Sequence, residues 1–470
     1  MQKIIFGTDG WRGLLDEELN LDNIRRVAQA FSIYINRKTS NGKVAIGFDS
    51  RRNSGLFALE FGRVLMANGI DAIISKGVVP TPVLSYFTLK ESCTAGVMIT
   101  ASHNPPQYNG IKFKTGTGAP FYTEETAKIE ALLDQQIPAV TDKNPQQSDF
   151  LNKYLQHINE QFDFDLIRKA GLSVVVDSMG GAGQDIIARI CHKHRIYCEG
   201  IFSKPETDFG ERTPEPIERN LQPLSENLSI SRFSLGLATD GDGDRLGVMD
   251  EKGIWVNIQE VILYLAEYLL GKYGPMGGIV KTSSVTDKIL SLQVDGKPVI
   301  VHDVQVGFKY VSEAMYAVDA LFGAEESGGF GFHNNFPDRD GIYSAFMLMQ
   351  MLAESGEKKL SDFLRKKRNQ FGRIYYDRID VWTSKPERHN VLPSLKIEPP
   401  KSLAGFPLRA VKSFISSRGI TNGLKFHLDG NPRWLLLRVS ETEPMVRVYA
   451  EAESMAEVKL LLAEGKKLFE

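Results

Sequence analysis

The sequence predicts an α/β protein of four domains, with three similar α/β units followed by a C-terminal α+β domain. Its 470 residues exceed the roughly 100–200 residues of an ordinary domain. Strand-like apolar runs alternate with helix-like runs over 1–370, which is typical of parallel α/β units. Beyond about residue 371 strand follows strand, which indicates an antiparallel sheet. We therefore predict domains at 1–149, 150–252, 253–370 and 371–470.

The first domain begins the alternation of strands and helices. Its expected strands are 43–48, 72–75 and 96–100, and its expected helices are 21–36 and 56–67. Residues 138–148 are rich in Pro, Gln, Asn and Asp, so we interpret them as a linker.

The second and third domains repeat the alternation. In the second we expect helices at 150–158 and 184–191 and strands at 173–177 and 234–239. In the third we expect a helix at 259–270, strands at 278–282 and 299–302, and a strand ending at Glu325. The similarity suggests an internal repeat, although no strict sequence period is present.

The last domain has a different order of elements. We expect strands at 374–381, 423–428, 434–439 and 446–450, a turn at 429–432 and a final helix at 455–469. This order of elements is typical of an α+β domain.

The composition argues against several classes of partner. With 56 Lys+Arg against 58 Asp+Glu, the net charge of −2 gives no global reason to expect a nucleic-acid or membrane partner. The three cysteines show no Cys-x-x-Cys spacing, which favours a reducing compartment. No signal peptide is evident, and no stretch approaches the ~20 apolar residues of a membrane span. We expect a cytoplasmic protein. The sequence leaves the oligomeric state open, and a monomer is compatible with it.

Two loops carry most of the functional information. Residues 100–105, Thr-Ala-Ser-His-Asn-Pro, follow an apolar strand and present Ser102 at its carboxyl end, where α/β proteins place reactive groups. An ordinary polar turn is the alternative. Residues 240–245, Asp-Gly-Asp-Gly-Asp-Arg, supply three carboxylates. A serine hydroxyl carries phosphate efficiently only when a cation neutralises the phosphoryl charge, so the two loops together indicate metal-assisted phosphoryl transfer.

The alternating Asp240, Asp242 and Asp244 point to one side of an extended segment. Such hard oxygen ligands suit Mg²⁺, Mn²⁺ or Ca²⁺. A calcium EF-hand fails at its sixth position, where glycine is required and Arg245 stands. A solvated acidic turn is the other alternative.

Two further loops can bind a substrate. Residues 323–329, Gly-Ala-Glu-Glu-Ser-Gly-Gly, combine carboxylates and a hydroxyl suited to vicinal sugar hydroxyls, or form an ordinary glycine-rich turn. Residues 438–447 place Arg438 and Arg447 around a turn that can clamp a phosphate dianion. Alternatively, these arginines are outward residues paired with Glu441 and Glu443.

In this order and spacing, the four loops resemble those of the α-D-phosphohexomutase superfamily, which includes phosphoglucomutases and phosphomannomutases. The resemblance covers essentially the whole chain and extends to 7–13, Gly-Thr-Asp-Gly-Trp-Arg-Gly, and to 109–112, Asn-Gly-Ile-Lys. It implies mixed sheets in the first three domains and an active site in the central cleft. It also implies a small-molecule hexose phosphate as the substrate.

The resemblance implies a role for each matching residue. Ser102 would be carried as phosphoserine, with one Mg²⁺ held by Asp240, Asp242, Asp244 and a phosphate oxygen on Ser102. The serine phosphate would pass to a hexose phosphate, and the resulting glucose 1,6-bisphosphate would turn round and return its other phosphate. The remaining implied site residues are Arg12, His103, Lys112 and Arg245 for catalysis, Glu325, Ser327 and Lys309 for the sugar, and Arg438, Ser440, Thr442 and Arg447 for the phosphate. Lys112 is a candidate for moving the sugar hydroxyl proton or for electrostatic stabilisation.

Two segments depart from the family pattern. Glu441 adds an anion to the phosphate clamp, and 332–337, Phe-His-Asn-Asn-Phe-Pro, differ from the usual form before Asp338. The Glu-Glu-Ser-Gly form and Gly307-Phe308-Lys309 are more similar to phosphoglucomutases, so we predict glucose phosphates, with mannose phosphates or dual specificity as the alternative. A metal-dependent sugar phosphatase and a non-catalytic phosphosugar-binding protein are the rival classes.

Overall fold

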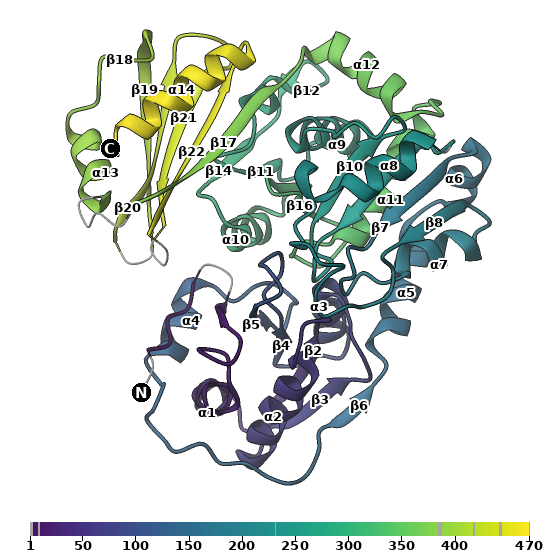
Figure 1. Cartoon of the computed structure of the whole chain (residues 1–470), viewed down its shortest axis with the longest axis vertical. Coiled ribbons are helices and arrows are strands. Elements are labelled where there is room, and N and C mark those ends of the chain that lie inside the picture. The colour runs from purple at the N-terminus through teal and green to yellow at the C-terminus, as the bar shows by residue number, and fades with distance from the viewer. Residues whose placement is uncertain are drawn as a thin grey trace.

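The structure is a computed structural model that describes residues 3–7, 10–230, 232–383, 388–416, 419–440 and 444–469. A principal β-sheet lies within each of the four predicted domains. In Figure 1 the first domain, in purple and blue, is at the bottom, and the C-terminal sheet, in green and yellow, is at the upper left. The second and third domains occupy the upper right and centre. The domain limits themselves stay predictions.

The first sheet is mixed and has α-helices on both faces. Its elements are β1 (Trp11–Leu14), α1 (Leu21–Lys38), β2 (Lys43–Phe48), α2 (Ser54–Ala67), β3 (Asp71–Ser75), α3 (Thr81–Lys90), β4 (Ala95–Ile99), β5 (Tyr108–Thr115), α4 (Thr123–Glu130) and β6 (Gln146–Ser148), with the strand order β1-β5-β4-β2-β3-β6. Strand β5 runs antiparallel to β4 and β1. Val44 and Ile46 pack with α1 and α2, whereas Ala45 packs with α3, because successive side chains of a strand point to opposite faces.

The second and third sheets are also mixed. The second domain contains α5 (Phe150–Gln161), α6 (Phe164–Ala170), β7 (Ser173–Asp177), α7 (Ile186–Lys193), β8 (Tyr197–Ile201), η1 (Glu218–Asn220), α8 (Gln222–Ile230), β9 (Leu235–Thr239) and β10 (Leu246–Asp250), with the strand order β10-β9-β7-β8. The third contains α9 (Ile258–Tyr273), β11 (Ile279–Thr282), η2 (Asp287–Ser291), β12 (Gln293–Val294), β13 (Lys297–Pro298), β14 (Val301–Val304), α10 (Phe308–Val318), β15 (Phe322–Glu325), β16 (Gly329–Phe332), α11 (Gly341–Glu354) and α12 (Leu360–Phe371), with the principal sheet in the order β14-β11-β15-β16. One continuous apolar core joins these two domains to α3 of the first, which fixes their mutual positions.

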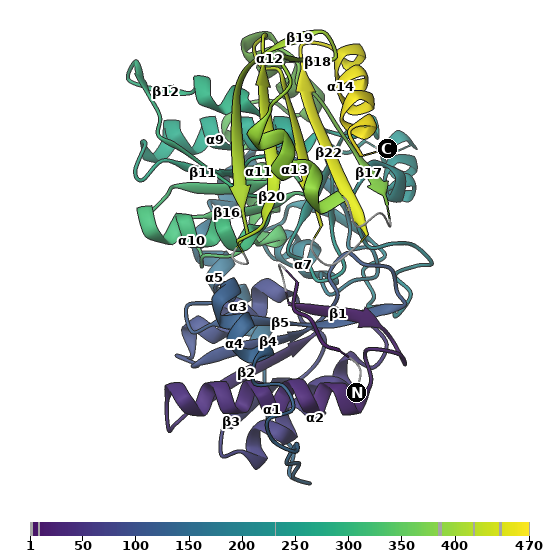
Figure 2. The same cartoon turned by 90° about the vertical axis from the view of Figure 1, so that its left-hand side faces the viewer.

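The C-terminal sheet is antiparallel throughout, as predicted. Its elements are β17 (Tyr375–Trp382), α13 (Arg388–Ile397), β18 (Ser402–Leu403), β19 (Phe406–Ile415), β20 (Thr421–Leu428), β21 (Trp434–Val439), β22 (Met445–Ala452) and α14 (Met455–Lys467), with the strand order β17-β22-β21-β20-β19-β18. Leu437 and Val448 pack against α14, which Figure 2 shows along one side of the sheet. On the opposite face Leu436 and Tyr449 pack with Val306 of the third domain.

Buried ion pairs add a second attachment between the third and C-terminal domains. The ammonium groups of Lys281 and Lys425 lie 3.0 and 2.9 Å from Oδ1 of Asp287, and both lysines are fully buried. The C-terminal sheet therefore meets the third domain through charged as well as apolar side chains.

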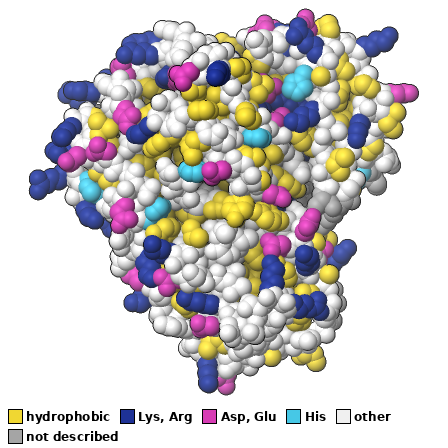
Figure 3. All heavy atoms as spheres, turned by 180° about the vertical axis from the view of Figure 1, so that it is seen from behind, with side chains coloured by type: hydrophobic (Ala, Val, Ile, Leu, Met, Phe, Trp, Pro, Cys, Tyr) yellow, Lys and Arg dark blue, Asp and Glu magenta, His cyan; other side chains and the backbone are white. Residues whose placement is uncertain are grey.

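The predicted fold class is confirmed. The expected strands 173–177 and 434–439 coincide with β7 and β21, whereas β1, α3 and β5 were not expected. Part of the predicted linker, Gln146–Ser148, is strand β6 and pairs with β3. Among the described helices, none is long and apolar enough to cross a membrane. Figure 3 shows positively and negatively charged side chains interspersed over the face seen from behind.

Candidate active site

Ser102 lies at the carboxyl end of β4 in a strained backbone conformation. Its φ angle of 53° falls in the left-handed region, which non-glycine residues seldom adopt. The Ser102 side chain is buried, and its Oγ donates a hydrogen bond of 3.0 Å to Oδ2 of Asp240. The serine loop of the first domain thus meets the aspartate loop of the second, as the sequence predicted for a shared site.

Two residues that the sequence analysis did not single out hold this loop. The guanidinium of Arg51 donates to the backbone oxygens of Ser102 and Asn104 at 2.6 Å, and to those of Pro105 and Tyr108 at 2.8 and 2.9 Å. Asp49 pairs with Arg51 at 3.1 Å and accepts a hydrogen bond from the hydroxyl of Thr100 at 2.5 Å. Both ion-pair side chains are fully buried. In the sequence, the Asp49-x-Arg51 spacing after a strand was the available sign of this pair. The backbone oxygens that Arg51 binds lie far along the chain, so the spacing alone does not reveal its role.

The three aspartates gather at the end of β9. One carboxylate oxygen from each of Asp240, Asp242 and Asp244 lies within 4.8 Å of the others, and all three residues are buried. Oδ1 of Asp240 accepts the backbone N–H groups of Asp244 and Arg245 at 2.9 and 3.1 Å, which folds the loop around this carboxylate. Strands β9 and β10 flank the loop, so the helix–loop–helix arrangement of an EF-hand is absent here.

The electrostatics of the aspartate loop fit a divalent cation. Burial, together with the charges of Asp242 and Asp244, raises the pKa of Asp240 well above its usual value. Burial alone would raise the pKa of Asp242, but the charge of Lys112 outweighs it and holds this pKa below its usual range. Within the described residues, Oδ1 of Asp242 and Oδ1 of Asp244 are buried without hydrogen-bond partners. Buried carboxylates with such oxygens are a suitable donor set for Mg²⁺.

Cations from the first and second predicted domains lie around the serine and aspartate loops. Nζ of Lys112, on β5, lies 2.8 Å from Oδ2 of Asp242 and 3.0 Å from Oδ2 of Asp244. Arg12, on β1, donates to the Asn104 side chain at 2.7 Å. Nε of Arg245 is 4.0 Å from Oδ2 of Asp240. Lys112, Arg12 and Arg245 therefore converge as the sequence predicted, and their catalytic roles stay predictions.

His103 lies within the same positive field. Burial, followed by the charges of Arg245, Arg12, Arg447 and Lys112, holds the pKa of His103 well below its usual value. Of these cations, Arg447 belongs to β22 of the C-terminal domain. At neutral pH the imidazole of His103 is therefore uncharged.

The predicted sugar-binding loop adjoins the aspartate loop through Arg339, whose role was not predicted. Arg339 donates at 2.8 Å to both Oε1 of Glu325 and Oδ2 of Asp244. Ser327 Oγ also donates to Oε1 of Glu325 at 2.7 Å. Glu326, by contrast, accepts hydrogen bonds from Ser284 and Thr282. In the sequence, Arg339 is marked only by its place between Asp338 and Asp340, and its burial became evident from the structure.

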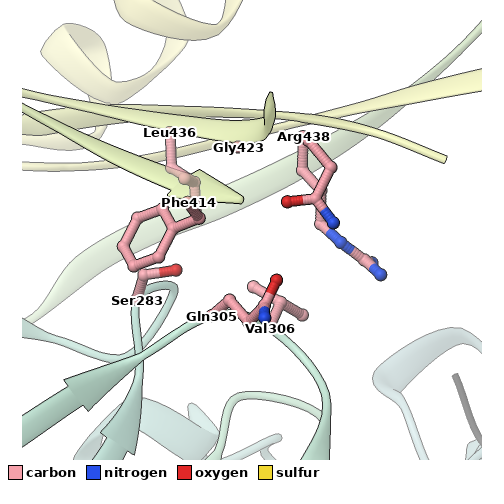
Figure 4. Close-up of a pocket in the computed structure, with 8 residues that line it drawn as sticks. Ser283, Gln305, Val306, Phe414, Gly423, Leu436 and Arg438 are labelled. Carbon is pink, nitrogen blue, oxygen red and sulfur yellow. The ribbon is translucent and has the colours of Figure 1, made fainter. Parts of the chain in front are cut away.

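The predicted phosphate clamp lies at the end of the C-terminal sheet. Arg438 and Arg447 are paired across β21 and β22, and the Ser440 N–H donates to the carbonyl oxygen of Met445 at 3.0 Å. Nε of Arg447 lies 3.7 Å from Oδ1 of Asp380. Figure 4 shows Arg438 extending from this sheet over a small pocket that Gln305 and Val306 of the third domain also line. The predictions for Glu441 and Thr442 fall on residues outside the described part of the chain.

Lys309, the remaining sugar-binding candidate, is buried at the junction of the third and first domains. Its ammonium donates to the hydroxyl of Thr123 at the start of α4. A contact between Lys309 and a sugar stays a prediction.

Comparisons with known proteins match the whole chain to one family. Models of the phosphoglucomutase/phosphomannomutase α/β/α domains I, II and III match residues 3–138, 152–253 and 257–371, and the model of the C-terminal domain matches 396–467. A provisionally named phosphoglucosamine mutase from Methanosphaera stadtmanae is 30% identical over 462 residues, covering 96% of this chain and 94% of the relative. The chain belongs to the phosphoglucomutase/phosphomannomutase family.

Other similar proteins support the same family and carry different names. A phosphoglucomutase/phosphomannomutase from Thermococcus kodakarensis is 28% identical, covering 99% of this chain and 98% of the relative. A solved structure from Thermus thermophilus, provisionally named phosphomannomutase, is 31% identical with a TM-score of 0.86, and covers 100% of this chain and 99% of that one. An N-acetylphosphoglucosamine mutase from Aspergillus fumigatus, solved with GlcNAc-6P and magnesium, has the same fold at 15% identity, with a TM-score of 0.56 and coverage of 99% of this chain and 95% of that one.

Membership of the family confirms the predicted superfamily and the predicted class of enzyme. Phosphohexomutases are isomerases that transfer a phosphoryl group within a hexose phosphate. The phosphohexomutase described here brings together a serine, three aspartates and a set of cations at the centre of its four domains.

Proposed function

We propose that this phosphohexomutase interconverts glucose 1-phosphate and glucose 6-phosphate through a phosphorylated Ser102 and a hexose 1,6-bisphosphate. The observation that carries the proposal is the 3.0 Å hydrogen bond between Ser102 Oγ and Asp240 Oδ2, made by residues 138 positions apart in the chain. A hydroxyl held against a buried carboxylate cluster is suited to phosphoryl transfer when a cation is bound.

Asp240, Asp242 and Asp244 would hold one Mg²⁺ together with a phosphate oxygen on Ser102. The buried oxygens described above, Oδ1 of Asp242 and Oδ1 of Asp244, support this assignment. When bound, the cation would neutralise charge on the phosphoryl group.

The surrounding side chains would orient the transferring phosphate and stabilise its charge. Lys112 is already paired with two carboxylates, which favours electrostatic stabilisation over proton abstraction, because a base needs a free lone pair. Arg245 and Arg12 would add positive charge on the side of the serine loop. His103, being uncharged, would act as a hydrogen-bonding group rather than as a cation.

Mutase chemistry needs a second phosphate site at a fixed distance from the serine. Arg438, Ser440, Thr442 and Arg447 would hold the phosphate that is not reacting, while Glu325 and Ser327 would bind sugar hydroxyls. A separate clamp of this kind favours a mutase over a phosphatase, because the bisphosphate must be retained between two transfers.

Two observations bear on the sugar. Glu326, which favoured glucose in the sequence, bonds to Ser284 and Thr282 rather than to Glu325 or Ser327. Its effect on specificity would therefore be indirect. The names of similar proteins include phosphoglucomutase, phosphomannomutase and phosphoglucosamine mutase, so glucosamine phosphate joins mannose phosphate as an alternative substrate.

The test is a side-by-side assay of glucose, mannose and glucosamine 1-phosphates with Mg²⁺ and a catalytic amount of the matching bisphosphate. Formation of the 6-phosphate and release of free phosphate are both measured. We expect the highest kcat/KM for glucose 1-phosphate, with little free phosphate. A higher value for another sugar would overturn the choice of glucose, and stoichiometric phosphate release would establish a phosphatase.

A further inference from the structure

Strand β5 carries two buried lysines on one face, and the proposed chemistry uses only one of them. Lys112 and Lys114 are two residues apart, so their side chains leave the strand in the same direction. They are 1% and 0% exposed, respectively. Lys112 pairs with the aspartate loop of the second domain. Lys114 crosses instead to the third domain.

The partner of Lys114 is Asp338, in the loop between β16 and α11. The ammonium of Lys114 forms an ion pair with Oδ2 of Asp338, and both side chains are fully buried. Ser85 Oγ contacts the same oxygen at 3.4 Å. The other oxygen of Asp338 accepts the backbone N–H of Arg339 at 2.9 Å. One carboxylate thus joins β5 to the backbone that carries Arg339.

Arg339 lies where the two substrate-facing loops meet. Its guanidinium joins Glu325 of the sugar loop to Asp244 of the aspartate loop, and it lies 5.5 Å from the centre of the Phe308 ring. Its side chain also runs close over Gly329, because a Cβ atom at that glycine would lie 2.3 Å from Cδ of Arg339. This close packing against Gly329 adds to the two ion pairs that hold the side chain in its place.

Removal of Lys114 would leave a buried carboxylate beside this guanidinium. Burial raises the pKa of Asp338, whereas the charges of Lys114 and Arg339 lower it. Without Lys114, Arg339 is the remaining cation among these, and Asp338 would compete with Glu325 and Asp244 for it.

We propose that Lys114 is a positioning residue for the mutase reaction, which acts by pairing with Asp338 and thereby holds Arg339 between Glu325 and Asp244. This inference rests on the proposed function. Lys114 thus has a role distinct from that of Lys112. Lys112 acts on the carboxylates proposed to bind the metal, whereas Lys114 acts on the Arg339 guanidinium, which joins those carboxylates to the sugar loop.

The experiment compares Lys114→Met with Lys153→Met in the sugar assay. Lys153 is a matched control, because it also pairs with a carboxylate, Glu91, but its side chain is 44% exposed. We expect Lys114→Met to lower kcat/KM per folded molecule by about 10- to 100-fold, since a small displacement of a binding group has effects of this size. We expect Lys153→Met to stay within about twofold of the wild type. Values within twofold for both variants would overturn the proposal.

A second comparison tests whether Lys114 acts through Arg339. In an Arg339→Gln background we expect Lys114→Met to cause little further loss, because residues that act through one another are not additive. A further loss of tenfold or more in that background would also overturn the proposal. If Lys114→Met does not fold, Lys114→Met/Asp338→Asn takes its place, since it leaves no unpaired buried charge. This variant lacks the competing carboxylate, so only the lost attachment of the Arg339 backbone to β5 acts in it. We expect a loss of about tenfold, at the lower end of the range above, and an unchanged kcat/KM refutes the role.

Assays of the wild-type enzyme distinguish a failure of this inference from a failure of the proposed function. Turnover of any of the three sugars supports the mutase, whatever the variants show. If the wild type turns over none of them, the same variants are compared by calorimetric binding of glucose 6-phosphate. Equal affinity in Lys114→Met and the wild type would refute the positioning role. Absence of any binding to the wild type would overturn both proposals.

Discussion

Arg51→Met should lower the local stability of the serine loop. The guanidinium makes four hydrogen bonds to backbone oxygens of the loop and one buried ion pair. A hydrogen bond to a charged group contributes about 1.5–3 kcal/mol, and a buried carboxylate left without its partner costs about 3–5 kcal/mol. Because these terms are not additive, we expect a loss of at least about 3 kcal/mol in local stability, which is more than a 100-fold change in the opening equilibrium.

Hydrogen exchange of the backbone amides at 100–110 measures this loss directly. A global unfolding curve would be less informative, because a four-domain chain need not unfold in one step. Arg52→Met is the control, since Arg52 pairs with Asp16 at the surface, with side chains 53% and 65% exposed, and such pairs contribute at most about 1 kcal/mol. Protection of 100–110 in Arg51→Met within about threefold of the control would refute the reasoning.

Four other outcomes are expected. Ser102→Ala should abolish turnover while leaving the thermal midpoint near that of the wild type, and an active variant would exclude the phosphoserine. Asp242→Asn should weaken Mg²⁺ activation by about 100-fold or more, which a magnesium titration of the rate measures; unchanged activation would mean that this carboxylate is structural. Arg447→Ala should raise KM for the sugar phosphate by about tenfold or more, as loss of a charge-assisted hydrogen bond requires; unaltered kinetics would remove it from the clamp. Burial raises the pKa of Asp340 to about 6, against about 3.9 in an unfolded chain. As the pH rises from 4 to 6 the unfolded state loses this proton first, so the Asp340 carboxyl should lower the free energy of unfolding by about 2 kcal/mol over that range. Asp340→Asn should lack this component when unfolding is followed against pH.

The sequence predicts those parts of the molecule whose information is local. The alternating aspartates of the second domain were expected to converge because an extended segment places every second side chain on one side. They do converge, but in a turn closed by a hydrogen bond from the Gly243 N–H to the Asp240 carbonyl oxygen, so the expected extended segment was wrong. Strands such as β7 and β21 are short apolar runs and were located correctly. The four loops also had recognisable spacing, and the family followed from them.

The missed features depend on partners far along the chain. Strand β5 contains Lys112 and Lys114, and a buried strand with two lysines does not match a simple hydrophobic pattern. The lysines are buried because carboxylates 130 and 224 residues later pair with them. Arg51 and Arg339 were overlooked for the same reason, since their roles lie in contacts that spacing does not reveal.

The long-range ion pairs of β5 have a consequence for biosynthesis. Ribosomes add about 5–20 residues per second, so Lys114 is made roughly ten to forty-five seconds before Asp338, 224 residues later. Lys112 is likewise made before its partner Asp242, which follows 130 residues later. Until those segments emerge, the nascent first domain carries two lysines without these carboxylates, and they must stay hydrated. The final burial of β5 is therefore a late event in synthesis, and a fragment that ends before Asp242 cannot reproduce the charge environment of Ser102.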